Sequence, residues 1–187
     1  MFETQIVQEL FDKEDQDLIY SSMMTKAKWN FLEDVSGSKN SLYPSHGFVH
    51  VFKHPNLGVL SEFNDAITDM FVPKLEDRLK IKIKDVHYMR AFLQIPLNEN
   101  YVKQHNGIHV DLDIPHLACV YYLNDTDGDT VIYDQTYNNG VHPNTFKEHK
   151  RVTPKAGNAV IFDGARYHCS SQPTKKLRCI INIDLII

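Results

Sequence analysis

The sequence lacks the features that mark several protein classes. Its three cysteines, Cys119, Cys169 and Cys179, form an odd and widely spaced set that gives no disulfide framework. No stretch approaches the ~20 apolar residues that a bilayer-spanning helix needs. The first residues also lack the basic start and the apolar run of a signal peptide. We therefore expect a cytoplasmic protein that does not enter a membrane.

An excess of positive charge is missing as well. The chain has 20 Lys and Arg residues against 24 Asp and Glu residues, a formal net charge of −4. Proteins that bind nucleic acids usually present a basic face, so a nucleic-acid partner is disfavoured. Small basic groups at Lys147, Lys150 and Arg151, or at Lys175 and Lys176, leave a local patch open. A solvated loop is the simpler interpretation of such groups.

The length of 187 residues favours a single domain over residues 1–187. The spacing of apolar residues predicts an amphipathic helix over about residues 6–24, broken near Lys13, and a second helix that begins at Ser61. Pro73 is expected to kink this second helix or to begin a new turn. Residues 48–53 have strand character. We expect residues 1–80 to form a mainly helical support.

Residues 81–187 have a different pattern, with short strand-like runs separated by turns. The runs cover residues 87–95, 108–111, 117–123, 130–134, 159–162 and 178–187. Many short strands at such spacing predict a sandwich or a barrel, with jelly rolls among the candidates. The expected fold is mainly β with N-terminal helices, in which a cupin-like double-stranded β-helix, or jelly roll, is supported by the helices.

His109 and Asp111 form the most informative pair in the chain. Residues 107–113 are predicted to form a strand, in which alternate residues share a face, so the two side chains point the same way. His168, on a later strand end, would complete a set of two imidazoles and one carboxylate. Such a set leaves coordination positions open, which suits a non-heme Fe(II) that must also bind a co-substrate and dioxygen.

Other residues compete for these ligand positions. Asp113 has the same strand parity as Asp111. We prefer Asp111, because two residues of strand rise, about 6–7 Å, still let both side chains of the pair reach one ion. His105 and His116 are alternatives to the chosen histidines. A structural zinc site is disfavoured, because the sequence has no Cys-x-x-Cys or closely spaced His pair to supply four protein ligands.

Arg178 begins a strongly apolar strand-like run over residues 178–187. A charge in such surroundings usually needs a partner, and the guanidinium fork matches a carboxylate. An ordinary surface arginine is the alternative. Combined with the metal triad, a carboxylate clamp predicts an oxygenase that uses a 2-oxo acid.

These residues and several short motifs resemble the Fe(II)/2-oxoglutarate-dependent dioxygenases, especially the short bacterial and phage members of the prolyl 4-hydroxylase-like branch. The resemblance runs from about residue 89 to the C-terminus. It rests on His109-Val-Asp111, Val120-Tyr-Tyr-Leu-Asn-Asp125, Asp127-Gly-Asp-Thr130, Val160-Ile-Phe-Asp163, His168 and Arg178-x-x-x-Asn182.

The resemblance implies that His109, Asp111 and His168 hold Fe(II) and form the catalytic centre. It also implies that Arg178 binds the distal carboxylate of 2-oxoglutarate. Dioxygen would be the second co-substrate, and ascorbate is left open as a further cofactor. The co-products would be succinate and carbon dioxide.

Two further co-substrate contacts are implied by the same resemblance. Tyr122 matches a position that hydrogen-bonds the carboxylate in some relatives, although a core aromatic is the alternative interpretation. Gln94 stands where relatives often place an Asn or a Tyr that faces the co-substrate. Both residues are therefore expected in the 2-oxoglutarate site.

The implied reaction is hydroxylation of a C–H bond. A prolyl side chain in a peptide or protein is the first candidate substrate, and a free amino acid or another small metabolite is the alternative. A cupin-like module that binds a metal or ligand without turnover is a further alternative. Asp184 stands where nucleic-acid demethylating relatives typically carry a second arginine, which disfavours base demethylation. The sequence does not indicate an oligomeric state.

Overall fold

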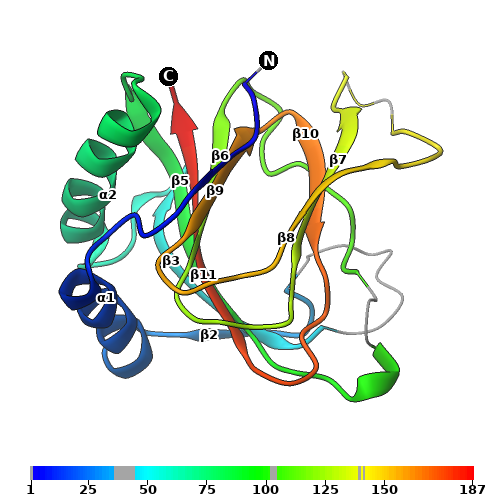
Figure 1. Cartoon of the computed structure of the whole chain (residues 1–187). Helices are drawn as coiled ribbons and strands as arrows, with labels where there is room; N and C mark the ends of the chain where they lie inside the picture. The colour runs from blue at the N-terminus through cyan, green and yellow to red at the C-terminus, as the bar shows by residue number, and fades with distance from the viewer. Residues whose placement is uncertain (1, 36–44, 102–104, 139, 141) are drawn as a thin grey trace.

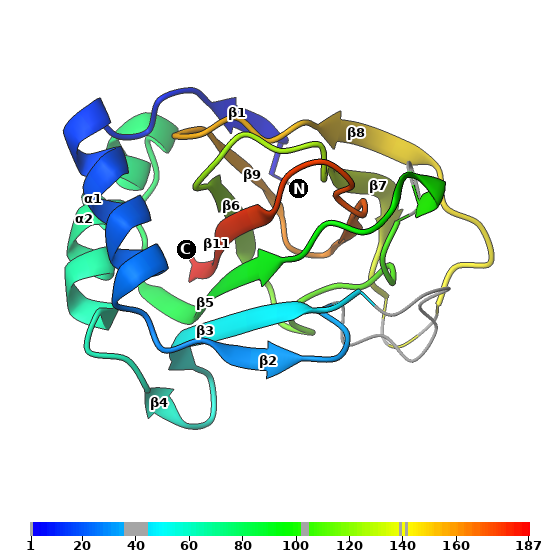
Figure 2. The ribbon, with the colours of Figure 1, turned by 90° about the horizontal axis from the view of Figure 1, so that it is seen from below.

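The computed structural model describes residues 2–35, 45–101, 105–138, 140 and 142–187. It consists of two antiparallel sheets with two helices packed beside the larger one (Figures 1 and 2). The elements are β1 (Gln5–Val7), α1 (Lys13–Thr25), β2 (Asn30–Leu32), β3 (Gly47–His54), β4 (Gly58–Val59), α2 (Asn64–Leu79), β5 (Asp85–Gln94), a 3₁₀ turn (Glu99–Tyr101), β6 (Leu117–Tyr122), β7 (Thr130–Thr136), β8 (Glu148–Val152), β9 (Ala159–Asp163), β10 (Arg166–Ser170) and β11 (Arg178–Ile186).

The two sheets have the connectivity of a jelly roll. Within the described residues, the larger sheet has eight strands in the order β1-β9-β6-β11-β5-β3-β2, with β4 paired to β3. The smaller sheet has the order β10-β7-β8. Strands distant in sequence are neighbours, and every strand pair is antiparallel. This arrangement confirms the predicted class, a mainly β fold of the double-stranded β-helix type with supporting helices.

The helices form where the sequence supplies a cap or an apolar stripe. The Asp12 side chain accepts a hydrogen bond from the Asp15 amide (3.0 Å), which caps the start of α1. In α2 the buried residues Ile67, Phe71 and Leu75 recur every four positions. The helix continues through Pro73. No helix in the described part of the chain is long and apolar enough to cross a bilayer.

Strand β6 separates two core layers. Cys119 and Tyr121 point toward the helices and join the main core cluster. Val120 and Tyr122 point the other way, into the cluster between the two sheets. This alternation follows the two-residue period of a strand. The face between the sheets is the one that borders the site.

Three local predictions were wrong. Residues 1–80 are not only a helical support, since β1 to β4 also lie there and β3 is inserted in the larger sheet between β5 and β2. Ile6, which was placed in the first helix, lies on β1, paired with β9. Residues 107–113 form no strand, because β10 pairs with this segment in a single bridge, His109 with His168.

The contact between α2 and the sheet should contribute strongly to stability. The Phe71 ring lies edge-on to Phe11 (4.7 Å between ring centroids) and to Tyr121 (5.0 Å). We expect Phe71→Ala to lower the free energy of unfolding by about 3–5 kcal/mol, because it removes a buried ring and leaves a cavity. Urea unfolding followed by circular dichroism measures this. Leu18→Ala, at a side chain that is 55% exposed, is the control and should change stability by less than about 0.5 kcal/mol. Equal losses would contradict the packing described.

Candidate functional site

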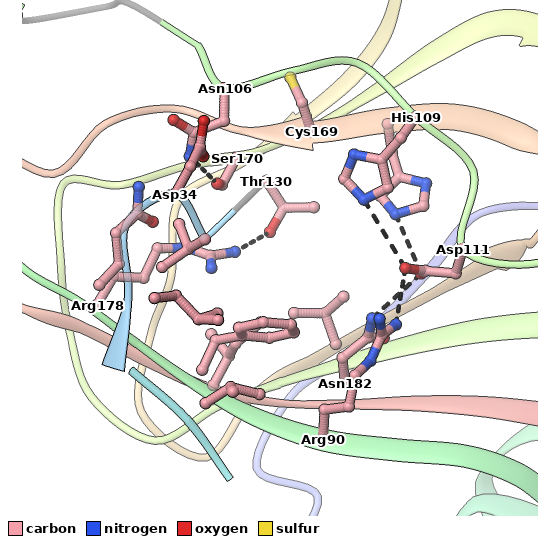
Figure 3. A pocket seen from close by; sticks show the side chains of 18 of the residues that line it. Asp34, Arg90, Asn106, His109, Asp111, Thr130, Cys169, Ser170, Arg178 and Asn182 are labelled. Carbon is pink, nitrogen blue, oxygen red and sulfur yellow. Dashed lines mark hydrogen bonds and ion pairs between the residues drawn. The ribbon is translucent and has the colours of Figure 1, made fainter. Parts of the chain in front are cut away.

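A cavity of about 450 Å³ opens between the two sheets. Its wall comes from strands of both sheets and from the segment that precedes β6 (Figure 3). Of the six residues expected from the sequence, five line it: Gln94, His109, Asp111, His168 and Arg178. The chain therefore brings together residues that are far apart in sequence.

His109, Asp111 and His168 place one ligand atom each within 4.8 Å of one another. The His168 Nε2 lies 3.2 Å from Asp111 Oδ2, and the His109 Nε2 lies 3.7 Å from Asp111 Oδ1. Two backbone hydrogen bonds between His109 and His168, of 3.0 and 2.8 Å, hold the imidazoles side by side. This is the one group of three such ligand atoms that the described residues contain.

The hydrogen bonds of the two imidazoles fix which nitrogen faces Asp111. The Nδ1 of His109 lies 2.8 Å from the Gly107 carbonyl, and the Nδ1 of His168 lies 3.2 Å from the Arg166 carbonyl. Because a carbonyl only accepts, each Nδ1 carries a proton and donates it. In the neutral ring, Nε2 then keeps its lone pair and faces Asp111. Burial and the neighbouring His168 lower the pKa of His109, which favours this neutral form.

The competing ligands lie elsewhere. The His105 Nδ1 is beside the Asn106 carbonyl (3.1 Å), and the side chain of His116 is buried against Gly164. Asp113 lines a second cavity together with His116. The geometry therefore groups Asp111, and not Asp113, with the two histidines.

Asp111 is held on both of its oxygens. Arg90 Nη2 donates to Oδ1 (2.7 Å), and Asn182 Nδ2 donates to Oδ2 (3.1 Å). Burial alone would raise the pKa of Asp111, but the Arg90 guanidinium is the largest influence that holds it well below its usual range. Arg90 also pairs with the buried Asp184 (3.3 Å). The carboxylate is therefore charged and ready to bind a cation.

Sequence reasoning missed Arg90 and the partner role of Asp184. A usable signal was present, since each is a charged residue within a strand that contributes several buried apolar side chains. A charge in such a strand needs a partner, which is the argument applied to Arg178. It would have marked all three residues.

Arg178 is a buried cation held by neutral groups. Arg178 is only 5% exposed. Its Nε donates a hydrogen bond to the Gly128 carbonyl (2.9 Å), and its Nη2 donates one to Thr130 Oγ1 (3.0 Å). A Cβ on Gly128 would lie 2.8 Å from the Arg178 side chain, so only glycine leaves it room. No carboxylate of the described residues forms an ion pair with it, and burial lowers its pKa. The cavity therefore presents a positive charge suited to an anion.

Tyr122 and Gln94 differ from the simplest expectation. Tyr122 lies behind the cavity wall and donates its hydroxyl to Thr130 Oγ1 (2.9 Å), while burial raises its pKa. Thr130, which lines the cavity, thus separates Tyr122 from it. Gln94 lines the cavity, and its Nε2 donates to Ser45 (2.7 Å) and to Gln172 (2.9 Å). Arg178 is therefore supported by Thr130 directly and by Tyr122 through Thr130.

The sequence matches the model of the 2OG-Fe(II) oxygenase superfamily over residues 97–183. The match covers the three close ligand residues and Arg178. Over these residues, just under half of the chain, the sequence is that of a 2OG-Fe(II) oxygenase. The enzyme uses Fe(II), 2-oxoglutarate and dioxygen, as the sequence predicted. No protein with a curated description matches the sequence.

Solved structures with the same fold include several members of the superfamily. A 2OG-Fe(II) oxygenase family oxidoreductase from Burkholderia pseudomallei is 12% identical, with a TM-score of 0.68 over 97% of this chain and 84% of that one. The non-heme alpha ketoglutarate dependent epimerase SnoN of nogalamycin biosynthesis is 10% identical, with a TM-score of 0.66 over 98% and 78%. A Pseudomonas putida prolyl-4-hydroxylase is 15% identical, with a TM-score of 0.58 over 97% and 91%. At these identities the likeness shows the fold alone.

The support of Arg178 by Thr130 can be tested by substitution. Thr130→Val keeps the shape of the side chain but removes the acceptor of both Arg178 and Tyr122. We expect a loss of about 1–3 kcal/mol in the free energy of unfolding, because buried donors are left without partners. Urea unfolding measures this loss. Thr136→Val, at a half-buried position of the same strand, is the control. A loss no larger than that of the control would show that Thr130 does not support the cation.

Proposed function

We propose that this oxygenase hydroxylates a C–H bond of its substrate at a centre formed by His109, Asp111 and His168, with 2-oxoglutarate bound to Arg178. The observation that supports this most is the pairing of two features in one cavity. Three ligand atoms lie within 4.8 Å of one another, and a buried guanidinium without a carboxylate partner among the described residues lines the same space. These groups would suit a dianionic co-substrate: the three ligands would hold the metal, and Arg178 would hold a carboxylate.

The ligand set fits Fe(II) in its chemistry. Two neutral imidazoles and one carboxylate suit a divalent iron and leave positions for co-substrate and dioxygen. The bound iron supplies the oxidative chemistry, in which 2-oxoglutarate and dioxygen become succinate and carbon dioxide and one oxygen atom enters the substrate.

The protein's own residues present the metal ligands, orient the co-substrate and exclude water. His109 and His168 present Nε2 lone pairs, because their Nδ1 protons are engaged by backbone carbonyls. Arg178 orients the co-substrate through its distal carboxylate, since the guanidinium fork is fixed by Gly128 and Thr130. Apolar side chains from three strands line the same cavity, which keeps the reacting centre poor in water; they are Phe92, Val120 and Ile180.

A prolyl side chain is the first substrate candidate. It comes from the sequence resemblance, and two proteins with this fold carry the name: the Pseudomonas putida prolyl-4-hydroxylase and a Trichoplax adhaerens prolyl hydroxylase in complex with a peptide fragment. A free amino acid or another small metabolite is the second candidate, favoured by a cavity whose volume suits a small molecule. SnoN, which shares the fold, was solved in complex with nogalamycin RO.

A nucleic-acid substrate finds no support in the surface charges. Lys147 pairs with Asp134 (3.1 Å), and Arg151 pairs with Glu148 (2.7 Å). These contacts favour the interpretation of a solvated, internally balanced strand over a basic patch.

We further propose that residues 1–187 act as one domain, since β1 and β3 pair with β9 and β5 of the later part. The proposed location of this domain is the cytoplasm.

The metal assignment predicts a spectroscopic signal. Anaerobic addition of Fe(II) and then 2-oxoglutarate should produce a metal-to-ligand charge-transfer band in the visible spectrum. His168→Ala should abolish the band, because one of the three ligands is lost. His149→Ala removes a histidine that pairs with Asp134 on the smaller sheet, and it should leave the band unchanged. A folded wild-type protein without the band would contradict the proposal.

The co-substrate assignment predicts a separate effect. Arg178→Ala should weaken 2-oxoglutarate binding by about 10- to 100-fold, since hydrogen bonds to a charged group contribute about 1.5–3 kcal/mol. Fe(II) binding should persist, because Arg178 touches none of the three ligands. Titration of 2-oxoglutarate against the charge-transfer band measures the affinity, with Arg151→Ala as the matched control. Unchanged affinity in Arg178→Ala would refute the assignment.

A further inference from the structure

Arg90 bridges two buried carboxylates beside the three proposed metal ligands. Its Nη2 lies 2.7 Å from Asp111 Oδ1 and 3.3 Å from Asp184 Oδ2. The side chains of Arg90, Asp111 and Asp184 are only 12%, 3% and 0% exposed. Figure 3 shows Arg90 and Asn182 on one side of the Asp111 carboxylate and His109 on the other. Buried charges in this arrangement are weakly screened by water.

Asp111 depends on this contact for its orientation. It lies outside any strand, so its own backbone segment does not hold it in a sheet. Arg90 and Asn182 are opposite each other in the β5–β11 register, and each donates to a different oxygen of Asp111. The guanidinium itself is held over the Tyr88 ring, 3.9 Å from its centroid. The larger sheet thus clamps both oxygens of a carboxylate that comes from a loop.

We propose that Arg90 is a positioning residue that fixes the Asp111 carboxylate for metal binding, and that Asp184 is its counter-charge. The inference rests on the proposed function, in which Asp111 binds the iron. A cation so close to a metal centre would by itself repel the metal. Asp184 Oδ2, 3.3 Å from the guanidinium, is placed to offset that repulsion, which gives a reason for an acid that is fully buried on an apolar strand. Burial and the Asp111 charge raise the pKa of Asp184, and the Arg90 guanidinium opposes that rise.

The two effects of Arg90 have opposite signs, and this makes the proposal testable. If the charge of Arg90 were its only influence, Arg90→Met would remove a repulsion and tighten metal binding. If Arg90 positions Asp111, the same change should weaken metal binding by about 10- to 100-fold, as loss of partners that orient metal ligands typically does. The direction of the change in affinity decides between them.

The experiment uses Mn(II) as the probe, with free Mn(II) followed by electron paramagnetic resonance in the presence of 2-oxoglutarate. The variants are Arg90→Met, Arg90→Lys and the double variant Arg90→Met with Asp184→Asn. Arg151→Met is the control, an arginine that is also ion-paired but lies on β8. Thermal unfolding of each metal-free protein is measured in parallel, so that folding and metal affinity are read separately.

We expect Arg90→Met to bind Mn(II) about 10- to 100-fold more weakly, and Arg90→Lys to fall between it and the wild type, since lysine keeps the charge but not the fork. The double variant removes the unpaired acid at position 184. It should therefore regain much of the unfolding temperature lost in Arg90→Met while its metal affinity stays weak.

If the wild type binds Mn(II) and Arg90→Met binds it equally well or more tightly, this inference would be overturned while the proposed function would stand. Recovery of metal affinity together with unfolding temperature in the double variant would overturn it as well, because charge balance would then explain both. If Arg90→Met does not fold, the double variant and Arg90→Lys decide by the same criteria. A folded wild-type protein that binds no Mn(II) would overturn the proposed function and this inference with it.

Discussion

The site depends on the pairing of β5 with β11 in the larger sheet. This register sets Arg178 opposite Gln94 and Asn182 opposite Arg90, with the intervening residues following the same ladder. Because side chains alternate across a strand, these four residues all line the cavity between the sheets. A slip of β11 by one residue would turn Arg178 and Asn182 toward the helices. The apolar residues on the other face, such as Met89 and Ile181, are fully buried and oppose such a slip.

That pairing places two buried cations at separate points of one cavity, in different electrostatic settings. Arg90 is neutralised by Asp111 and Asp184, and these acids raise its pKa against the effect of burial. Arg178 has only neutral partners among the described residues, and burial lowers its pKa. The desolvation cost of burying a balanced cation such as Arg90 is offset by the acids that pair with it in the fold. An unbalanced one retains a demand for an anion, so the difference supports the proposal that Arg178, and not Arg90, binds the co-substrate.

Much of the site could be predicted from the sequence because its residue types are unusual where they stand. His109, Asp111, His168 and Arg178 carry motif or burial signals that need no knowledge of strand partners. Arg90 and Asp184 carried the same burial signal, but their joint action depends on a strand register that the sequence does not show. The error over residues 107–113 has a similar origin, since alternation of residue types predicts a strand while only a partner strand makes one. Strand β8 was missed because this sheet-edge strand exposes most of its polar side chains and shows little apolar alternation.

The proposed metal centre draws on both sheets. His168 belongs to β10 of the smaller sheet, and its two backbone hydrogen bonds carry His109 with it. Asp111 is clamped by Arg90 and Asn182 of the larger sheet. The separation of the sheets is in turn set by the buried side chains between them, including Tyr122, Ile132 and Phe162. Close packing of that layer therefore fixes the distance between the histidines and the carboxylate, which links the core of the jelly roll to the geometry that a divalent ion requires.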